Sequence, residues 1–307
     1  MRWRTLCCAI LTLSILMPAA GVPVSELTFA SGVSVDRIIT VDGMERTYRV
    51  HVPPAAGSPG ELPVLIVLHG GGGNGKQIER TTGFSDLADE EGFIAVYPDG
   101  SGRLPKRLTW NAHNCCAYAH AEHIDDVGFI SELIGQLIAN DPVDPARIYI
   151  AGHSNGAMMT FRLACERSDL FAAAAPYAGA LNSDTCPAEN PVPILIMNGE
   201  DDQNVPILGG ASPHVGATVE DERIDQPASY AVDTWVAANG CVGNPVVDDS
   251  AAAMITTWTD CADDSAVEQL VIHGWEHAWP SIDDGAPIDA SRVIWEFVSG
   301  YAKPRQA

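Results

Sequence analysis

The pentapeptide GHSNG at residues 152–156 has the composition of a serine nucleophile placed on a sharp turn. An apolar run precedes it and a stretch rich in small residues follows, so the pattern predicts a strand that turns directly into a helix. In that setting Ser154 projects its hydroxyl outward, and Gly152 and Gly156 leave space for a strained backbone. The helix N-terminus favours negative charge, and the N–H of Asn155 is placed to donate to it. We therefore predict that Ser154 is the nucleophile of an acyl-transfer reaction.

A serine nucleophile needs a histidine base, and the base needs a carboxylate that orients it. For a nucleophile on this kind of turn the acid precedes the histidine along the chain. Residues 198–206 (NGEDDQNVP) follow an apolar run and hold three adjacent acids, of which we favour Asp202 and keep Asp201 as the alternative. Two histidines follow the last apolar run. We favour His277, because it lies in a loop that is free to reach the serine, over His273 at the end of the run.

A glycine-rich loop, HGGGGNGK at residues 69–76, follows the first strongly apolar run. It nearly matches two nucleotide-binding motifs, but residue 77 is Gln where a phosphate-binding loop requires a hydroxyl, and the second motif is a weak signal alone. A purely structural turn is another alternative. We favour an oxyanion loop, in which the N–H of Gly71 or Gly72 donates to a substrate oxygen. This interpretation requires no cofactor.

A dense cluster of histidine, cysteine and aspartate occupies residues 110–126. Such density can indicate zinc, but the spacing matches no standard zinc pattern, and we predict no metal. We expect instead a loop pinned by a disulfide beside the site. The residues that we expect to line the substrate cleft are Trp110, Asn111, His153 and Trp279.

Short apolar runs alternate with helix-like segments along the chain, which predicts an α/β fold with a mostly parallel central sheet and helices on both faces. The runs are residues 64–68, 93–97, 147–151, 171–177, 194–197 and 267–272. The expected helices include 126–139, 155–166 and 290–301, and a β-hairpin over 33–41 and 48–52 precedes them. Long loops, 203–226 and 278–288, are expected at the carboxyl edge of the sheet, where ligands bind in such folds.

The chain begins with the pattern of an export signal. Arg2 and Arg4 precede an apolar run, 6–17, that is shorter than the ~20 residues needed to span a bilayer, and small residues follow. We predict a signal peptide over 1–21 and one catalytic domain over 22–307, secreted or periplasmic.

Cysteine content and charge fit an exported protein. Two of the 8 cysteines lie in the signal, and the even number that remains indicates disulfides. We predict the pair Cys241–Cys261 and leave the pairing of the other four open. The formal charge of −23 repels nucleic acid and anionic membranes, so we expect neither as a partner and favour neutral ester substrates.

Together these residues resemble the extracellular polyhydroxybutyrate depolymerases and feruloyl-esterase-like α/β hydrolases. The resemblance covers residues 45–300. Its landmarks are LHGG at 68–71, WN at 110–111, CC at 115–116, DDVGF at 125–129, GHSNGAMM at 152–159 and HAWP at 277–280. It implies the α/β-hydrolase fold and carboxylic-ester hydrolysis, with Asp202 as the acid and His277 as the base. One departure is Asn198, where the family usually has His.

We therefore predict a secreted serine carboxylic-ester hydrolase that acts through an acyl-enzyme, first of all a polyhydroxybutyrate depolymerase-like esterase. A feruloyl or acetylxylan esterase is the alternative among ester hydrolases. A serine peptidase and a non-catalytic binding protein on the same fold are the alternatives outside that class. The oligomeric state is left open.

Overall fold

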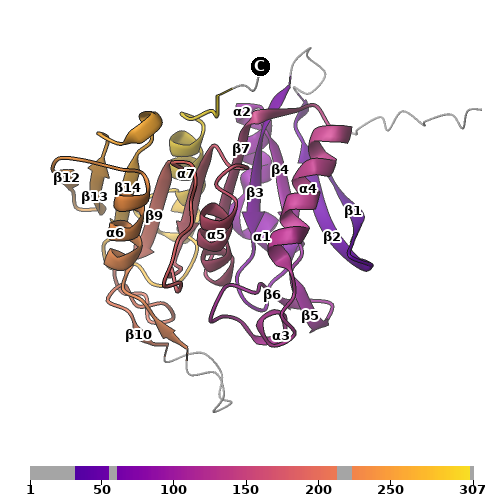
Figure 1. The fold of residues 1–307 in the computed structure, drawn as a ribbon, viewed down its shortest axis with the longest axis horizontal. Helices are drawn as coiled ribbons and strands as arrows, with labels where there is room; N and C mark the ends of the chain where they lie inside the picture. Colours follow the sequence, from indigo (N-terminus) through magenta and orange to yellow (C-terminus); the bar gives the residue numbers. More distant parts are fainter. Residues whose placement is uncertain (1–31, 55–60, 213–222, 305–307) are drawn as a thin grey trace, which may run out of the picture.

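A sheet of 10 strands forms the centre of the computed structural model, which describes residues 32–54, 61–212 and 223–304 (Figure 1). The order across the sheet is β1 (Val33–Val41), β2 (Met44–Val52), β4 (Ile94–Pro98), β3 (Leu62–Leu68), β7 (Val143–His153), β8 (Ala173–Tyr177), β9 (Ile194–Gly199), β14 (Val267–Ile272), β13 (Ala253–Trp258) and β12 (Val246–Asp249). Neighbours from β4 to β14 pair in parallel, and the strands outside them pair antiparallel. The predicted signal over 1–21 lies outside the described residues.

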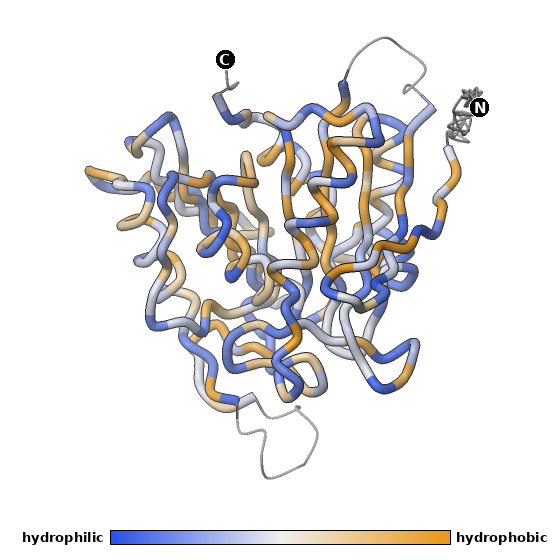
Figure 2. Tube along the Cα trace, turned by 45° about the vertical axis from the view of Figure 1, so that its right-hand side comes forward, coloured by the Kyte–Doolittle hydropathy of each residue, from blue (hydrophilic) through white to orange (hydrophobic). Residues whose placement is uncertain are grey.

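The apolar runs of the sequence form the middle of this sheet. Each of the six predicted runs becomes a strand, and β4, β8 and β9 are buried along their whole length. Figure 2 shows apolar residues concentrated along the central strands and polar residues in many of the connecting loops. A strand covered on both faces has no solvent side, so it does not alternate between apolar and polar residues. The mostly parallel sheet is therefore confirmed.

Helices cover both faces of the sheet and bury a core on each (Figure 1). On one face lie α4 (Asp126–Asn140), α5 (Asn155–Glu166) and α6 (Ala228–Ala238), which contribute Phe129, Met159 and Trp235 to one core. On the other lie α1 (Gly75–Thr82), α2 (Phe84–Glu91) and α7 (Ala290–Val298), which contribute Ile78, Phe84 and Trp295 to the second. No helix in the described parts of the chain has the length and apolar character needed to cross a membrane.

Smaller elements gather near the carboxyl edge of the parallel strands. They are β5 (Ser101–Leu104), β6 (Arg107–Thr109), α3 (Ala117–Ala121), β10 (Gly210–Ala211), β11 (Ile224–Asp225) and a 3-10 turn at Ile282–Asp284. A second 3-10 turn, Ala262–Asp264, precedes the start of β14 at the opposite edge. The long loop expected over 203–226 contains one short antiparallel pairing, of β10 with β11. The last helix ends at Val298 rather than at residue 301.

Three disulfides link described residues. The predicted partners Cys241 and Cys261 are joined, and the structure pairs the other four cysteines as Cys165–Cys186 and Cys115–Cys116. Cys241 follows α6 and Cys261 follows β13, so their disulfide fastens the antiparallel edge of the sheet to a helix that covers it.

Removing the Cys241–Cys261 disulfide should lower the free energy of unfolding. The partners are separated by 20 residues, and closing a loop of this size stabilises a fold by roughly 3 kcal/mol, because it restricts the unfolded chain. We expect that loss in the Cys241→Ser/Cys261→Ser double variant, measured by urea unfolding. The Cys165→Ser/Cys186→Ser variant is the matched comparison, since its separation is 21 residues. An unchanged unfolding midpoint for the first variant would contradict the expectation.

Candidate active site

Ser154 occupies the turn between β7 and α5 in a conformation that side chains rarely adopt. Its φ is 56° and its ψ is −120°. Such strain persists only where the surroundings enforce it, and it is concentrated at functional sites. A Cβ added to Gly152 would collide with the Gly156 carbonyl oxygen, and one added to Gly156 would collide with the Leu68 carbonyl oxygen. Both flanking glycines are therefore required by close backbone approach.

A continuous chain of hydrogen bonds links Ser154, His277 and Asp202. The Ser154 hydroxyl donates to His277 Nε2 at 2.9 Å, and His277 Nδ1 donates to Asp202 Oδ2 at 2.7 Å. The other Asp202 oxygen accepts from the N–H groups of Asn204 and Val205 at 2.8 and 2.9 Å. A neutral imidazole with its proton on Nδ1 fits this arrangement.

The two alternatives left open by the sequence lie elsewhere. Asp201 is exposed, whereas the Asp202 side chain is fully buried against His277. His273 lies between the carboxylates of Glu200 and Asp249, which raise its pKa. Neither Asp201 nor His273 enters the hydrogen-bond chain of Ser154.

The sheet brings these three side chains together from distant parts of the sequence. Ser154, Asp202 and His277 each follow a parallel strand, namely β7, β9 and β14, so they meet at one edge of the sheet. The acid loop and the base loop also touch directly, since the Asp201 N–H donates to the Trp275 carbonyl at 2.9 Å.

Among the main-chain N–H groups beside Ser154 that have no acceptor in the described residues, two belong to residues predicted as donors from the sequence. They belong to Asn155, at the start of α5, and to Gly71, whose added Cβ would lie 3.6 Å from the Asn155 Cβ. The first N–H groups of a helix have no intrahelical partner, so that of Asn155 is free for a ligand. The expectation for Gly72 is corrected, because its N–H donates to the Leu108 carbonyl at 2.8 Å.

A buried histidine shapes the glycine loop. His69 Nδ1 donates to the Gly70 carbonyl at 2.8 Å, and His69 Nε2 accepts from the Gly100 N–H at 3.0 Å. A protonated ring has no acceptor nitrogen, so the second bond requires the neutral form. Burial lowers the pKa of His69 to about 4. This role of His69 was not predicted from the sequence.

The low pKa of His69 predicts a loss of stability in acid. The unfolded chain takes up a proton near pH 6.5 and the folded chain only near pH 4, so the stabilisation is complete above pH 6.5 and disappears as pH falls to 4. One pKa unit is worth ~1.4 kcal/mol, which gives about 3 kcal/mol over this range. The His69→Gln variant carries no titrating group at this position. Its free energy of unfolding should therefore fall by about 3 kcal/mol less than that of the wild type between pH 6.5 and pH 4. Urea unfolding at several pH values measures the difference. Parallel pH curves for the two proteins would refute this.

The side-chain amide of Asn155 pairs with the main chain of Trp110. Asn155 Oδ1 accepts from the Trp110 N–H at 2.7 Å, and Asn155 Nδ2 donates to the Trp110 carbonyl at 3.1 Å. The Trp110 indole in turn donates to the His69 carbonyl at 2.9 Å. Trp110 thus joins the nucleophile turn to the glycine loop from behind.

Two of the four residues expected to line the substrate cleft need correction. Trp110 is fully buried and Trp279 is 5% exposed, so both indoles pack behind the site and offer no surface to a substrate. Asn111 is half-buried, and its amide donates to the Ile124 carbonyl and so holds the loop. His153 is half-buried, and its Nε2 bonds to the carbonyl of His277.

The histidine–cysteine segment forms a loop beside Asn155. Cys115 and Cys116 are joined to each other, and Asn155 Nδ2 lies 3.6 Å from the Cys115 sulfur. Arg223 covers the same pair, with Nη1 3.5 Å from the Cys115 sulfur. Within the described ranges, no three His, Cys, Asp or Glu residues are grouped so that they could hold a metal ion.

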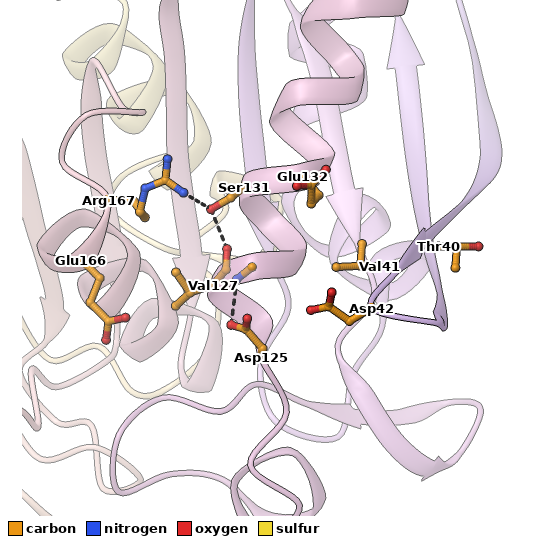
Figure 3. Close-up of a pocket in the computed structure, with 10 residues that line it drawn as sticks. Thr40, Val41, Asp42, Asp125, Val127, Ser131, Glu132, Glu166 and Arg167 are labelled. Carbon is orange, nitrogen blue, oxygen red and sulfur yellow. Dashed lines mark hydrogen bonds between the residues drawn. The ribbon is translucent and has the colours of Figure 1, made fainter.

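A surface hollow, drawn in Figure 3, is lined by residues other than those of this site. It measures about 480 Å³ and is lined by Thr40, Val41, Asp42, Asp125, Val127, Gly128, Ser131, Glu132, Glu166 and Arg167. None of Ser154, Asp202 and His277 borders it, and four of its ten lining residues carry carboxylates. The hollow therefore takes no part in the chemistry of the Ser154 site.

Comparison with known proteins places the chain in a family. Residues 46–208, more than half of the chain, match the family model described as Esterase PHB depolymerase. The chain belongs to this family. The match includes the glycine loop, Ser154 and Asp202, whereas His277 lies beyond it.

Curated proteins similar to this Esterase PHB depolymerase family member are esterases and depolymerases. Putative esterase NocK of Nocardia uniformis subsp. tsuyamanensis is 29% identical over 84% of this chain and 77% of its own. Feruloyl esterase B of Piromyces equi is 30% identical over 79% of this chain, which spans 42% of that protein. Poly(3-hydroxyalkanoate) depolymerase C of Paucimonas lemoignei is 32% identical over 42% of this chain and 30% of its own.

The solved structures confirm the fold of this family member. The acetyl xylan esterase from Aspergillus awamori matches over 86% of this chain and 99% of its own, with a TM-score of 0.58 and 15% identity. The chain has the α/β-hydrolase fold and is a carboxylesterase of the serine hydrolase type.

Proposed function

We propose that Ser154, His277 and Asp202 are the nucleophile, base and acid of this carboxylesterase. The observation that carries the proposal is the unbroken chain from the Ser154 hydroxyl through His277 to a buried carboxylate. Its order and geometry are those required for nucleophilic acyl transfer. A non-catalytic protein on this fold would have no need for the strained φ of 56° at Ser154.

The mechanism follows from these contacts. His277 Nε2 takes the proton of Ser154 as the oxygen attacks the ester carbonyl, and Asp202 stabilises the resulting imidazolium. His277 then gives the proton to the departing alcohol, which leaves an acyl-enzyme on Ser154. Water attacks the acyl group with His277 again as base, and a carboxylic acid is released.

The negative charge of each tetrahedral intermediate would be held by the N–H groups of Gly71 and Asn155. Both groups are free of other acceptors within the described residues, and both lie on rigid supports. His69 fixes the glycine loop, and Trp110 fixes the Asn155 side chain. Donors that are already in place need no reorganisation when charge develops, which is the main electrostatic contribution to catalysis of this kind.

We further propose that the substrate is a neutral ester, first of all a polyester of hydroxybutyrate type. The rim near Asp202 and His277 carries the exposed carboxylates Glu200, Asp201 and Glu276, on a chain of formal charge −23. Such a rim repels anionic substrates and favours release of the carboxylate product. The names of the relatives support two classes, polyhydroxyalkanoates and the feruloyl or acetylxylan esters of plant cell walls.

Export belongs to the same proposal. Three disulfides link described residues, and disulfides persist in oxidising compartments. With the predicted signal over 1–21 removed, residues 22–307 would form one catalytic domain outside the cytoplasm.

Chromatography of reaction products tests the substrate class. The mature protein is incubated separately with poly(3-hydroxybutyrate) and with methyl ferulate, and Ser154→Ala is the blank. Release of 3-hydroxybutyrate or its short oligomers supports the polyester assignment. Release of ferulate alone would indicate that the substrates are esters of plant cell walls. Equal product from wild type and Ser154→Ala would overturn the triad, and cleavage of peptide amides at the ester rate would indicate a peptidase.

A further inference from the structure

The loop that carries His277 is held in place by two side chains from neighbouring strands. His153 is the last residue of β7, and Tyr177 is the last residue of β8. His153 Nε2 donates to the carbonyl of His277 itself at 2.9 Å, and the Tyr177 hydroxyl donates to the carbonyl of Ala278 at 2.6 Å. Two successive carbonyls of the base loop are thus fixed from below.

Tyr177 connects the base to the nucleophile through its two ends. Its hydroxyl binds the loop of His277, and its main-chain carbonyl accepts from the Ser154 N–H at 3.0 Å. It lies on β8, between the strands that lead to Ser154 and to Asp202, and β8 itself contributes no triad residue. A single residue therefore relates the positions of the serine and the histidine.

The rings of the two residues form one packed unit with the base. The His153 and Tyr177 rings stack with centroids 5.5 Å apart and planes at 14°. The His153 ring also contacts the His277 ring, with centroids 5.0 Å apart, and Trp279 packs edge-on against both His153 and Tyr177. Neither hydrogen bond can shift alone, because the rings that make them are packed against each other.

We propose that His153 and Tyr177 are positioning residues for the base, which hold the His277 loop so that Nε2 faces the Ser154 hydroxyl. This role rests on the proposed function of Ser154 and His277, and it requires contact with the His277 loop rather than with the substrate. Burial supports it, since it lowers the pKa of His153 to about 4 and so keeps this ring neutral beside His277, where a second positive charge would oppose formation of the imidazolium.

Single variants that remove a donor and keep a ring test the proposal. They are Tyr177→Phe and His153→Phe, assayed with p-nitrophenyl butyrate. We expect kcat to fall about 10- to 100-fold with KM nearly unchanged, because a small misplacement of a catalytic group has effects of this size. The rate of labelling of Ser154 by a fluorophosphonate should fall in parallel.

Two controls separate positioning from a general effect on the fold. The Tyr149 hydroxyl, on β7, donates to the Tyr301 carbonyl at 2.8 Å, and neither residue contacts the triad. Tyr149→Phe removes this similar hydrogen bond and should leave kcat unchanged. His153→Gln carries an amide N–H at about the reach of the imidazole Nε2, and it should recover most of the activity that His153→Phe loses. Unfolding midpoints are measured for every variant.

The outcomes are distinguishable. Wild-type kcat in both Tyr177→Phe and His153→Phe, with Ser154→Ala inactive in the same assay, would overturn the positioning role and leave the triad intact. Equal loss in His153→Gln and His153→Phe would overturn the role of the His153 N–H. Activity in Ser154→Ala would instead overturn the proposed function on which the inference rests.

Discussion

Ser154→Ala should lower kcat for ester hydrolysis by about a million-fold, the effect seen when the nucleophile of a serine hydrolase is removed. The hydroxyl at 2.9 Å from His277 Nε2 is the atom that forms the acyl-enzyme, and no other group within the described site can replace it. The residual rate would come from the oxyanion donors and from substrate binding. Steady-state hydrolysis of p-nitrophenyl butyrate measures the change.

The variant should fold as the wild type does, because the substitution removes one oxygen. Ser299→Ala is the matched control, since Ser299 is exposed in the turn after α7 and should leave kcat unchanged. Covalent labelling by a fluorophosphonate should be lost in Ser154→Ala and kept in Ser299→Ala. Retained labelling of Ser154→Ala would show that another residue is the nucleophile.

Asp202→Asn should lower kcat by about 10⁴-fold while KM changes little. The carboxylate accepts from His277 Nδ1 at 2.7 Å, and an amide at the same place can present its NH₂ group and favour the wrong tautomer. The Asn204 and Val205 N–H groups would still find an oxygen, so the loop should keep its shape. Kinetics of the purified variant against the wild type measure the effect.

The neighbouring acid offers a control of identical chemistry. Asp201→Asn removes a carboxylate one residue away, but that side chain is exposed and has no contact with His277 in the described structure. We expect kcat within a factor of about two of the wild type, as for an exposed substitution. If Asp201→Asn were the inactive variant and Asp202→Asn the active one, the acid would be wrongly assigned.

The positions of Ser154, Asp202 and His277 were predictable from the sequence, because each lies in a recognisable local pattern. The turn at Ser154 needs glycine on both sides, and the loops of Asp202 and His277 follow apolar runs that form neighbouring strands. Each feature is local, so the sequence alone can indicate it.

The supporting residues could not be predicted, because their roles depend on contacts across the fold. Trp110 was expected at a substrate cleft, yet its indole binds the His69 carbonyl and is fully buried. Gly72 was a candidate donor, yet its N–H donates to the carbonyl of Leu108, on β6. Neither partner is indicated by spacing along the chain.

In the fold, too, the elements with a local sequence pattern were predicted and those that depend on distant contacts were not. The buried parallel strands were predicted from continuous apolar runs, whereas β12 and β13 were not. Every residue of β12 is exposed, so this edge strand has no apolar pattern to identify it. The pairing of Cys165 with Cys186 likewise depends on where α5 ends relative to the loop after β8.

The order of strands in the sheet also determines when the protein can become active. His277 lies 123 residues beyond Ser154 and 75 beyond Asp202, and the three meet only after β7, β8, β9 and β14 have paired in parallel. Long-range parallel pairings are among the slowest contacts to form, because the entropy of closing a long chain segment is lost before the pairing stabilises the fold. The apolar residues on either face of the sheet can therefore be buried before Ser154, Asp202 and His277 come together and ester hydrolysis becomes possible. A newly made chain would stay harmless to the esters around it until its sheet is complete.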